Sequence, residues 1–312
     1  MRTAAAALGA TLVVLASATC FAQTPGPPKP AAAAATFDSS RAWEHLRQIV
    51  AIGPRPAGSE QLAQARSYIK KQLAASGVSA IEQTWEQKTP FGPATMVNLI
   101  ATIPGDRKDR IVFSGHYDTK LFRPFRFVGA NDGGSSAAFL IELARVLKAR
   151  RNPLTIEIVF LDGEEAMCEN WDDCGTPGAP DNTYGSRHYV ETAKRDGTLY
   201  TLKANVLVDM IADRDLQILR EENSTRWLTD IIWDAAKRLK QDQIFVAQST
   251  PIEDDHLPFL EAGVPSVDII DLDYPHWHKP GDTLDAVSAR SLQIVGDVLL
   301  AALPVIEARL TK

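Results

Sequence analysis

Two adjacent glutamates, Glu164 and Glu165, are the most informative feature of the sequence. The apolar run 155–160 predicts a buried strand, and both carboxylates come just beyond its end. Open α/β sheets bind their ligands at the carboxyl ends of strands. One carboxylate could therefore coordinate a metal while its neighbour carries a proton, which is the division of roles that metal-assisted acyl transfer requires. For such a pair taken alone, the alternative is a solvated acidic loop.

Further carboxylates and histidines occupy similar places along the chain. They are His116 after the run 110–114, Asp132 before a predicted helix, Asp209 at the end of the run 204–209, Asp254 before a short predicted helix, and His278 after the run 264–270. Random placement would not restrict these residue types to strand ends, so the pattern predicts a metal site. Nitrogen and carboxylate ligands without thiolates favour zinc with three protein ligands and an open position. Calcium or magnesium would need more oxygen ligands.

The elements that must position these residues alternate between helices and strands. Apolar spacing predicts helices over 39–51, 60–76, 135–150, 185–196, 225–240, 256–262 and 286–310, and strands over 96–103, 110–114, 155–161, 204–209 and 264–270. Such alternation predicts an α/β fold in three layers, with a mostly parallel, twisted central sheet flanked by helices. The carboxyl ends of the parallel strands then gather the chemistry at one edge of the sheet.

The N-terminus predicts a secretory signal peptide over residues 1–22. Arg2 gives a positive start, residues 4–18 are apolar without a charge, and Cys20-Phe21-Ala22 approximates a cleavage site. A transmembrane anchor is the alternative, but this apolar core is shorter than the ~20 residues that a bilayer helix needs. Lipidation at Cys20 is a second alternative, although the residues before it suit a lipobox poorly. We therefore expect an exported protein, periplasmic or secreted.

The rest of the chain suits one catalytic domain. Residues 23–36 are rich in proline and alanine and predict a linker. About 275 residues remain over 37–312, a length that one large α/β domain can occupy. The formal net charge of −6 becomes −7 when Arg2 leaves with the signal peptide, and no basic run is present to hold nucleic acid. We expect a monomer with no nucleic-acid partner and no membrane anchor after signal removal.

Two cysteines remain after the signal peptide, Cys168 and Cys174, with five residues between them in a loop rich in Gly, Pro and Asp. In an exported protein this spacing favours a small structural disulfide. A metal-thiolate pair is the alternative, but two thiolates without a neighbouring cysteine or histidine pair make a poor zinc site.

Several motifs together resemble a known superfamily. These are Ile52-Gly53-Pro54-Arg55-Pro56-Ala57-Gly58-Ser59, Gly115-His116-Tyr117-Asp118, Asp162-Gly163-Glu164-Glu165 and the trailing His278. They resemble the zinc-dependent exopeptidases with the M28 aminopeptidase-like fold, from about residue 40 to the C-terminus. A narrower resemblance is to the glutaminyl-peptide cyclotransferases, the animal-type glutaminyl cyclases. It is carried by Asp181-Asn182-Thr183-Tyr184-Gly185-Ser186-Arg187-His188, by Glu253-Asp254-Asp255-His256-Leu257-Pro258-Phe259-Leu260 and by Trp277-His278.

This resemblance implies a role for each matching residue. Asp132, Glu165 and His278 become the ligands of one zinc ion, Glu164 the general acid/base, and Asp209 with Asp254 a hydrogen-bonded acid pair that supports it. Trp171, Trp277 and Tyr274 become substrate-binding residues. The implied reaction is a zinc-dependent acyl transfer on peptide or protein N-termini, in which an N-terminal glutamine closes to pyroglutamate and ammonia leaves. Asp268 and Tyr274 depart from the animal enzymes, which have histidine and phenylalanine there.

Two other functions stay open at the level of the sequence. In a two-zinc aminopeptidase, His116 and Asp209 would bind a second zinc ion, Asp132 would bridge the two ions, and Glu164 would activate a water molecule. The other alternative is a catalytically inactive binding module. Loss of a ligand or of the base would be its signature, and all of these residues are present.

Overall fold

The computed structural model describes Met1, Gly9, residues 35–176 and residues 178–312. Apart from Met1 and Gly9, the predicted signal peptide lies outside the described residues, and so does nearly all of the predicted linker. Phe37, the first large apolar residue of the described segment, is 3% exposed, and its ring centroid lies 4.9 Å from that of Phe139. A Cβ atom at Gly296 would come within 2.5 Å of the Phe37 ring, so this contact depends on glycine there.

A six-stranded sheet forms the centre of the fold, in the order β1-β2-β4-β3-β7-β10. The strands are β1 (Ala80–Thr89), β2 (Gly92–Ile103), β3 (Arg107–His116), β4 (Leu154–Leu161), β7 (Leu202–Asp209) and β10 (Ser266–Ile270). The four strands β4, β3, β7 and β10 are parallel, whereas β2 and β1 extend the sheet in antiparallel fashion. The strands β4, β7 and β10 are buried over almost their whole length, and β3 is buried from Ile111 onward, as expected when helices cover both faces.

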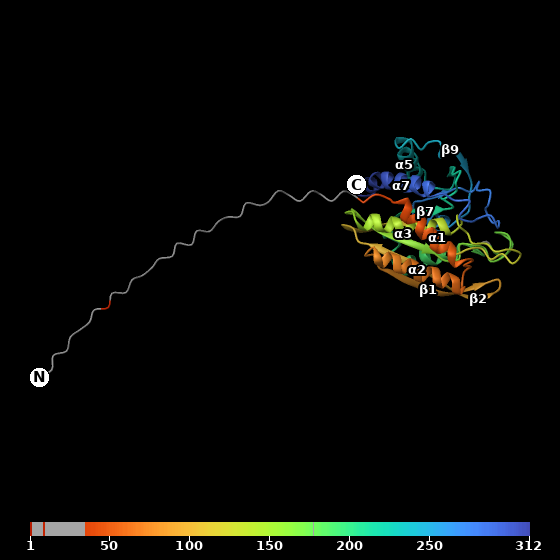
Figure 1. Ribbon diagram of the computed structural model, residues 1–312, viewed down its shortest axis with the longest axis horizontal. Helices are drawn as coiled ribbons and strands as arrows, with labels where there is room; N and C mark the ends of the chain where they lie inside the picture. Colours follow the sequence, from red (N-terminus) through yellow and green to blue (C-terminus); the bar gives the residue numbers. More distant parts are fainter. Residues whose placement is uncertain (2–8, 10–34, 177) are drawn as a thin grey trace. The chain divides into compact units, whose positions relative to one another are not determined.

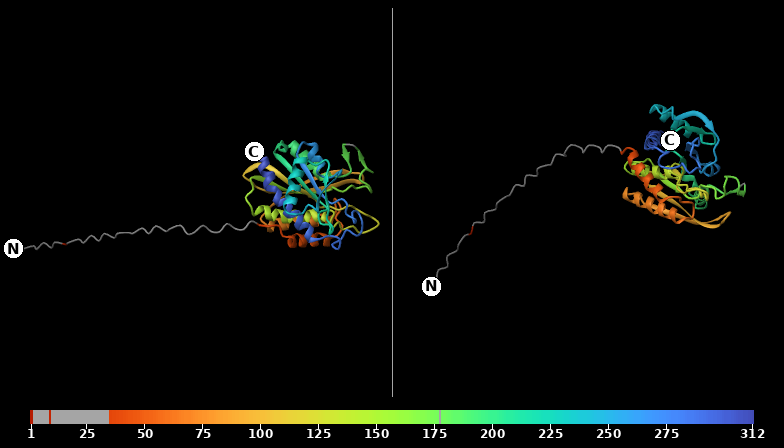
Figure 2. Two further views of the ribbon diagram at one scale, coloured as in Figure 1. Left: turned by 90° about the horizontal axis from the view of Figure 1, so that it is seen from above. Right: turned by 45° about the vertical axis from the view of Figure 1, so that its right-hand side comes forward.

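Helices cover the two faces of this sheet (Figures 1 and 2). One layer contains α1 (Ser39–Ile52), α2 (Glu60–Ala75), α3 (Gly134–Lys148), α5 (Arg226–Arg238) and α7 (Ala289–Leu310). The other contains α4 (Tyr184–Arg195), the short 3-10 helix η1 (Leu199–Thr201) and α6 (Leu257–Glu261). Each layer packs on its own apolar cluster, the larger around Phe139 and the smaller around Phe259. The predicted three-layer α/β fold is confirmed.

Helix α7 is long and apolar enough to cross a membrane by length and composition, which its mean hydropathy of 1.6 reflects. In the structure 61% of its most apolar window is buried inside the protein. Its side chains Leu292, Val295 and Leu303 belong to the larger apolar cluster. The composition of α7 is therefore that of a core helix packed against α1, α3 and α5.

The sequence missed the polar strands. β1 and the first residues of β2 form an antiparallel hairpin in which exposed and half-buried residues alternate, so no continuous apolar run marks them. A short parallel pair, β8 (Ile218–Glu221) and β9 (Phe245–Thr250), was also missed, as was the two-residue hairpin of β5 (Gly175–Thr176) and β6 (Ala179–Pro180). Strands this short, or this exposed, carry too weak a pattern to be predicted.

Candidate active site

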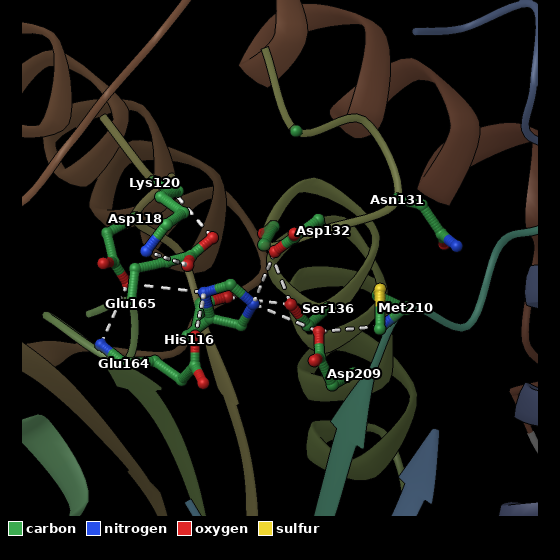
Figure 3. A network of polar contacts seen from close by, with 12 residues as sticks. His116, Asp118, Lys120, Asn131, Asp132, Ser136, Glu164, Glu165, Asp209 and Met210 are labelled. Carbon is green, nitrogen blue, oxygen red and sulfur yellow. Dashed lines mark hydrogen bonds and ion pairs between the residues drawn. The ribbon is translucent and has the colours of Figure 1, made fainter. Parts of the chain in front are cut away.

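The candidate site lies at the carboxyl ends of the parallel strands. His116 is the last residue of β3 and Asp209 the last of β7, while Glu164 and Glu165 lie in the loop after β4. Asp132 precedes α3, as the sequence predicted. Figure 3 shows these side chains converging around the imidazole of His116. Parallel pairing of β4, β3 and β7 brings together strand ends that are far apart in the sequence.

His116 stands at the centre of four carboxylates and is 1% exposed. Its Nε2 atom lies 3.1 Å from Oδ1 of Asp209 and 3.4 Å from Oδ1 of Asp132. Its Nδ1 atom lies 3.4 Å from Oδ1 of Asp118 and 3.8 Å from Oε2 of Glu164. Burial alone would lower the pKa of His116, but Asp209 and the other carboxylates outweigh it and raise that pKa well above its usual value. The contact with Asp118 orients the imidazole.

A second group of ligand atoms joins Asp132 to Glu165 and His278. Nε2 of His278 lies 3.2 Å from Oε2 of Glu165 and 3.5 Å from Oδ2 of Asp132. The ligand atoms of these three residues lie within 4.8 Å of one another, and so do those of His116, Asp132 and Asp209. Asp132 belongs to both groups, with Oδ1 toward His116 and Oδ2 toward His278.

Glycine at position 133 permits this arrangement. Gly133 has φ +73°, and a Cβ atom there would lie 2.2 Å from the carbonyl oxygen of Asp118 and 3.0 Å from Cε1 of His116. Any other residue would combine backbone strain with a direct clash. The chain can therefore pass from Asp132 into α3 directly beside the His116 imidazole.

The carboxyls that could hold a metal differ in charge state. Burial and then the charge of Glu165 raise the pKa of Asp132 to about 7. Burial opposes ionisation of Glu165 as well, but His278 and Lys120 outweigh it and lower the pKa of Glu165 to about 2. Opposite shifts in neighbouring carboxyls are typical of functional sites.

Glu164 is the carboxyl that neither ligand group uses. It is 6% exposed, and burial raises its pKa well above its usual value. Its backbone is fixed on both sides, because its N–H donates to Oδ1 of Asp118 at 3.4 Å and its carbonyl accepts the N–H of Thr183 at 2.9 Å. The start of α4 thus holds the Glu164 loop, which explains why the segment around Tyr184 accompanies the Glu-Glu pair in the sequence.

The predicted acid pair, Asp209 and Asp254, lies in the same cavity without a direct hydrogen bond between described atoms. Asp209 Oδ1 instead accepts bonds from His116 Nε2 and from the backbone N–H of Met210. Burial and then Asp209 raise the pKa of Asp254 to about 8. Asp268 is fully buried on β10, and burial followed by the charge of Asp254 raises its pKa well above the usual value. The raised pKa values of Asp254 and Asp268 favour their protonated forms beside Asp209.

His256 lies behind these acids and is fully buried. Its Nε2 atom is 3.0 Å from Oε2 of Glu221, and its Nδ1 atom is 3.7 Å from Oδ2 of Asp268. Burial opposes ionisation of Glu221, but His256 and then the hydrogen bonds from Asn223 and Ser224 outweigh it and lower the pKa of Glu221 to about 2. His256 therefore supports the segment that carries Asp254.

A cavity of about 270 Å³ opens over the ligand groups. Trp171 and Trp277 both line it, beside Glu164, Asp254 and His278. The rest of the lining is divided between apolar residues, among them Met210, Ile252, Ile270 and Leu272, and acidic ones. The ring of Trp277 stacks on that of His278, with centroids 4.5 Å apart. The cavity has room for one medium-sized side chain beside the two ligand groups.

Tyr274 does not line this cavity, although the sequence placed it among the substrate-binding residues. It is 3% exposed, and its hydroxyl donates to Oδ1 of Asp282 at 2.8 Å. Asp282 also accepts the backbone N–H groups of Asn131 and Asp132, at 2.8 and 3.2 Å. Tyr274 thus stabilises the backbone of Asp132 through their shared partner, Asp282. No signal in the sequence pointed to Asp282, which is 150 positions from Asp132.

Lys120 is a second residue that the sequence missed. Its side chain is 3% exposed, and its Nζ atom donates to the carbonyls of Ala166 and Cys168 at 2.8 and 3.0 Å. The backbone N–H of Lys120 donates to Oε1 of Glu165 at 3.0 Å. A signal was available, because His116, Asp118 and Lys120 alternate along an extended segment, in which every second side chain points the same way.

The predicted disulfide is present between Cys168 and Cys174. It closes the loop that carries Trp171. Two histidines outside the site have structural contacts: His45 Nδ1 lies 2.9 Å from the hydroxyl of Tyr68, and the ring of His188 stacks on Trp85 with centroids 4.1 Å apart.

Residues 98–303 match the family model "Peptidase family M28", which is more than half of the chain. Two curated relatives match as well, each 30% identical. A glutaminyl-peptide cyclotransferase-like protein of Mus musculus matches over 79% of this chain and 70% of its own, and a glutaminyl-peptide cyclotransferase of Drosophila melanogaster over 78% and 75%. The chain belongs to the glutaminyl-peptide cyclotransferases of peptidase family M28. The resemblance seen in the sequence motifs is confirmed.

Among solved structures, the glutaminyl cyclase of an Acidobacteriales bacterium is similar over 92% of this chain and all of that one. The TM-score is 0.82 and the sequence identity 39%. The M28 cyclotransferase fold therefore extends over nearly the whole described chain, with the ligand groups at its strand ends.

Proposed function

We propose that this protein converts the N-terminal glutamine of peptides or proteins to pyroglutamate, with release of ammonia and with zinc as cofactor. The observation that carries the proposal is the position of Glu164. Its carboxyl lines the cavity beside Glu165, belongs to neither ligand group, and keeps a raised pKa. A free carboxyl of this kind suits a proton carrier.

The group of Asp132, Glu165 and His278 fits the proposed zinc site. Imidazole nitrogens and carboxylate oxygens both bind zinc, and three protein ligands leave a fourth position open for substrate. Oδ2 of Asp132 is buried and has no hydrogen-bond partner among the described residues, as expected of an atom kept for a metal. When bound, zinc supplies Lewis-acid polarisation of the substrate γ-carbonyl oxygen.

The proposed reaction needs one proton to change places. The α-amine of the substrate forms a bond to its own γ-carbonyl carbon, and the bond from that carbon to the amide nitrogen breaks. Glu164 takes a proton from the attacking amine and returns it to the departing nitrogen, which leaves as ammonia. Such proton transfer is usually worth ~10²–10⁴ in rate. Because the nucleophile belongs to the substrate, the reaction requires no activated water.

Asp209, Asp254 and the tryptophans complete the proposal. We assign Asp209 and Asp254 to the acid pair that maintains the proton balance around Glu164. Both line the cavity, and burial and then the charge of Asp209 raise the pKa of Asp254. Trp171 and Trp277 are the proposed walls for the glutamine side chain. Apolar walls exclude water, and water would compete with the amine for the γ-carbonyl carbon.

A paired assay tests the proposal directly. The purified, zinc-loaded protein is incubated with a glutaminyl peptide and, separately, with leucyl amide. The proposal predicts pyroglutamate and ammonia from the first substrate and no comparable release of leucine from the second. Efficient leucine release without pyroglutamate formation would reject it.

A two-zinc aminopeptidase is the second candidate, because the ligand group of His116, Asp132 and Asp209 shares Asp132 with the first group. One contact argues against the aminopeptidase: Asp209 Oδ1 accepts a hydrogen bond from His116 Nε2 at 3.1 Å, so these two residues bind each other. Zinc counted on the purified protein distinguishes the two functions. One ion per chain favours the cyclotransferase, and two ions together with leucine release favour the aminopeptidase.

A further inference from the structure

Two more cavities lie beside the active-site cavity, with volumes of about 350 and 260 Å³. All three cavities share Trp171, Asp172 and Glu253 in their walls. They therefore meet at these residues, where the loop that follows Cys168 faces the loop that precedes Asp254. We call the two outer cavities the exit groove.

The exit groove has a strongly acidic lining. Asp172 and Glu253 are exposed, as is Glu261 at the far end of the smaller cavity. Within the described part of the chain, none of these three carboxylates forms an ion pair or accepts a hydrogen bond through its side chain. The lining contains one cation, Arg187, which is engaged by the carbonyls of Pro180 and Asn182. The negative charge of the groove is therefore uncompensated.

Asp254 provides an independent sign that the groove receives a ligand. It is 3% exposed and lines both the active-site cavity and the smaller outer cavity. Its Oδ2 atom is buried and has no hydrogen-bond partner in the described structure. Buried carboxylate oxygens without a donor are rare in folded proteins, so a donor from a bound molecule is expected here.

We propose that the exit groove binds the second and third residues of the substrate peptide and selects basic side chains there. The inference rests on the proposed function. Only when the N-terminal glutamine occupies the active-site cavity does the rest of the peptide extend into the groove. An extended peptide advances about 3.3 Å per residue. Asp172 and Glu253 line the active-site cavity as well as the groove, so residues two and three of the peptide would pass these two carboxylates, and lysine or arginine would pair with them.

Four zinc-dependent assays test the inference, on Gln-Lys-Ala, Gln-Ala-Lys, Gln-Ala-Ala and Gln-Glu-Ala amides. Exposed ion pairs are weak singly, so we expect kcat/KM for Gln-Lys-Ala to exceed that for Gln-Glu-Ala by about tenfold at low salt. This ratio should shrink toward about twofold in 1 M salt, where the Debye length is about 3 Å. In the double variant Glu253→Gln, Asp172→Asn the ratio should fall close to one. The ratio does not depend on how much of a variant is folded.

The control is Asp234→Asn, which removes the same charge from an exposed position of α5. It should keep the full ratio. Cyclisation of all four peptides at equal rates would overturn the inference and leave the proposed function standing, and so would a ratio that survives in the double variant. If none of the four peptides is cyclised, the proposed function fails and the inference fails with it.

Discussion

The hydroxyl of Tyr274 and the carboxylate of Asp282 form a hydrogen bond of 2.8 Å directly behind the candidate zinc site. The same carboxylate accepts the backbone N–H groups of Asn131 and Asp132, so one buried acid joins the loop before His278 to the loop of a metal ligand. Groups that orient a metal ligand through its backbone affect metal affinity without touching the metal.

Substitution at these two positions should weaken zinc binding. For Asp282→Asn, which removes the charge and one acceptor oxygen, we expect the zinc Kd to rise by about tenfold, within the range usual for residues behind metal ligands. Tyr274→Phe loses one hydrogen bond, and we expect it to raise the zinc Kd by about threefold to tenfold. Competition with a chromogenic chelator measures both values. A zinc Kd equal to that of the wild type in both variants contradicts the role of this contact.

The disulfide between Cys168 and Cys174 should act on substrate binding. It constrains the loop of Trp171, and its removal adds the cost of ordering that loop to each binding event. For Cys168→Ser, Cys174→Ser we expect KM for a glutaminyl peptide to rise by about fivefold, which corresponds to about 1 kcal/mol. A KM identical to that of the wild type would show that the loop is held without the bond.

We also propose that the protein is exported, since disulfides persist in oxidising compartments. Titration of the denatured, unreduced mature protein should then find no free thiol.

His45 should make stability depend on pH. Burial, and then the charge of Arg41, lowers the pKa of His45 from 6.5 to about 4, while the unfolded chain keeps the usual value. Between pH 6.5 and pH 4 the unfolded state therefore binds a proton that the folded state does not, and stability is lost as the pH falls. We expect this residue to remove up to about 3 kcal/mol across that window.

The measurement is urea unfolding of the wild type and of His45→Gln between pH 4 and 7. Glutamine can still accept the hydrogen bond from Tyr68 but does not titrate. The difference between the two proteins should change across the window and be constant above it. Parallel pH profiles would rule out a neutral, buried His45.

The strand ends that carry the site could be predicted because β3, β4, β7 and β10 are buried on both faces and form continuous apolar runs. Once those strands are placed, parallel pairing brings His116, Asp209 and the Glu164-Glu165 loop to one edge. β1 could not be found in the same way, because its edge position leaves a polar, half-exposed pattern. The sequence thus predicts strands that are buried and apolar, and it misses strands that are exposed to solvent and polar.

Tyr274 and Asp282 illustrate the limit for the site. Tyr274 is an aromatic residue close to Trp277-His278 in the sequence, so its type suits a pocket wall. Only the path of the loop decides whether its ring faces the cavity or the protein interior. Here the ring lies in a small apolar cluster with Met210, Ile252 and Ile270. The hydroxyl then finds Asp282, a contact that depends on the complete tertiary structure.

The central claim is that Glu164 carries the proton while its neighbours hold the metal, and Glu164→Gln tests it most directly. The amide preserves the shape of the side chain and cannot exchange the proton. We predict that the variant binds as much zinc as the wild type and loses at least about 10²-fold in kcat on a glutaminyl peptide. His278→Ala, as the matched control, should lose the zinc itself. A Glu164→Gln variant that is loaded with zinc and retains more than about a tenth of the wild-type rate would contradict the account, since general-base effects are larger than that.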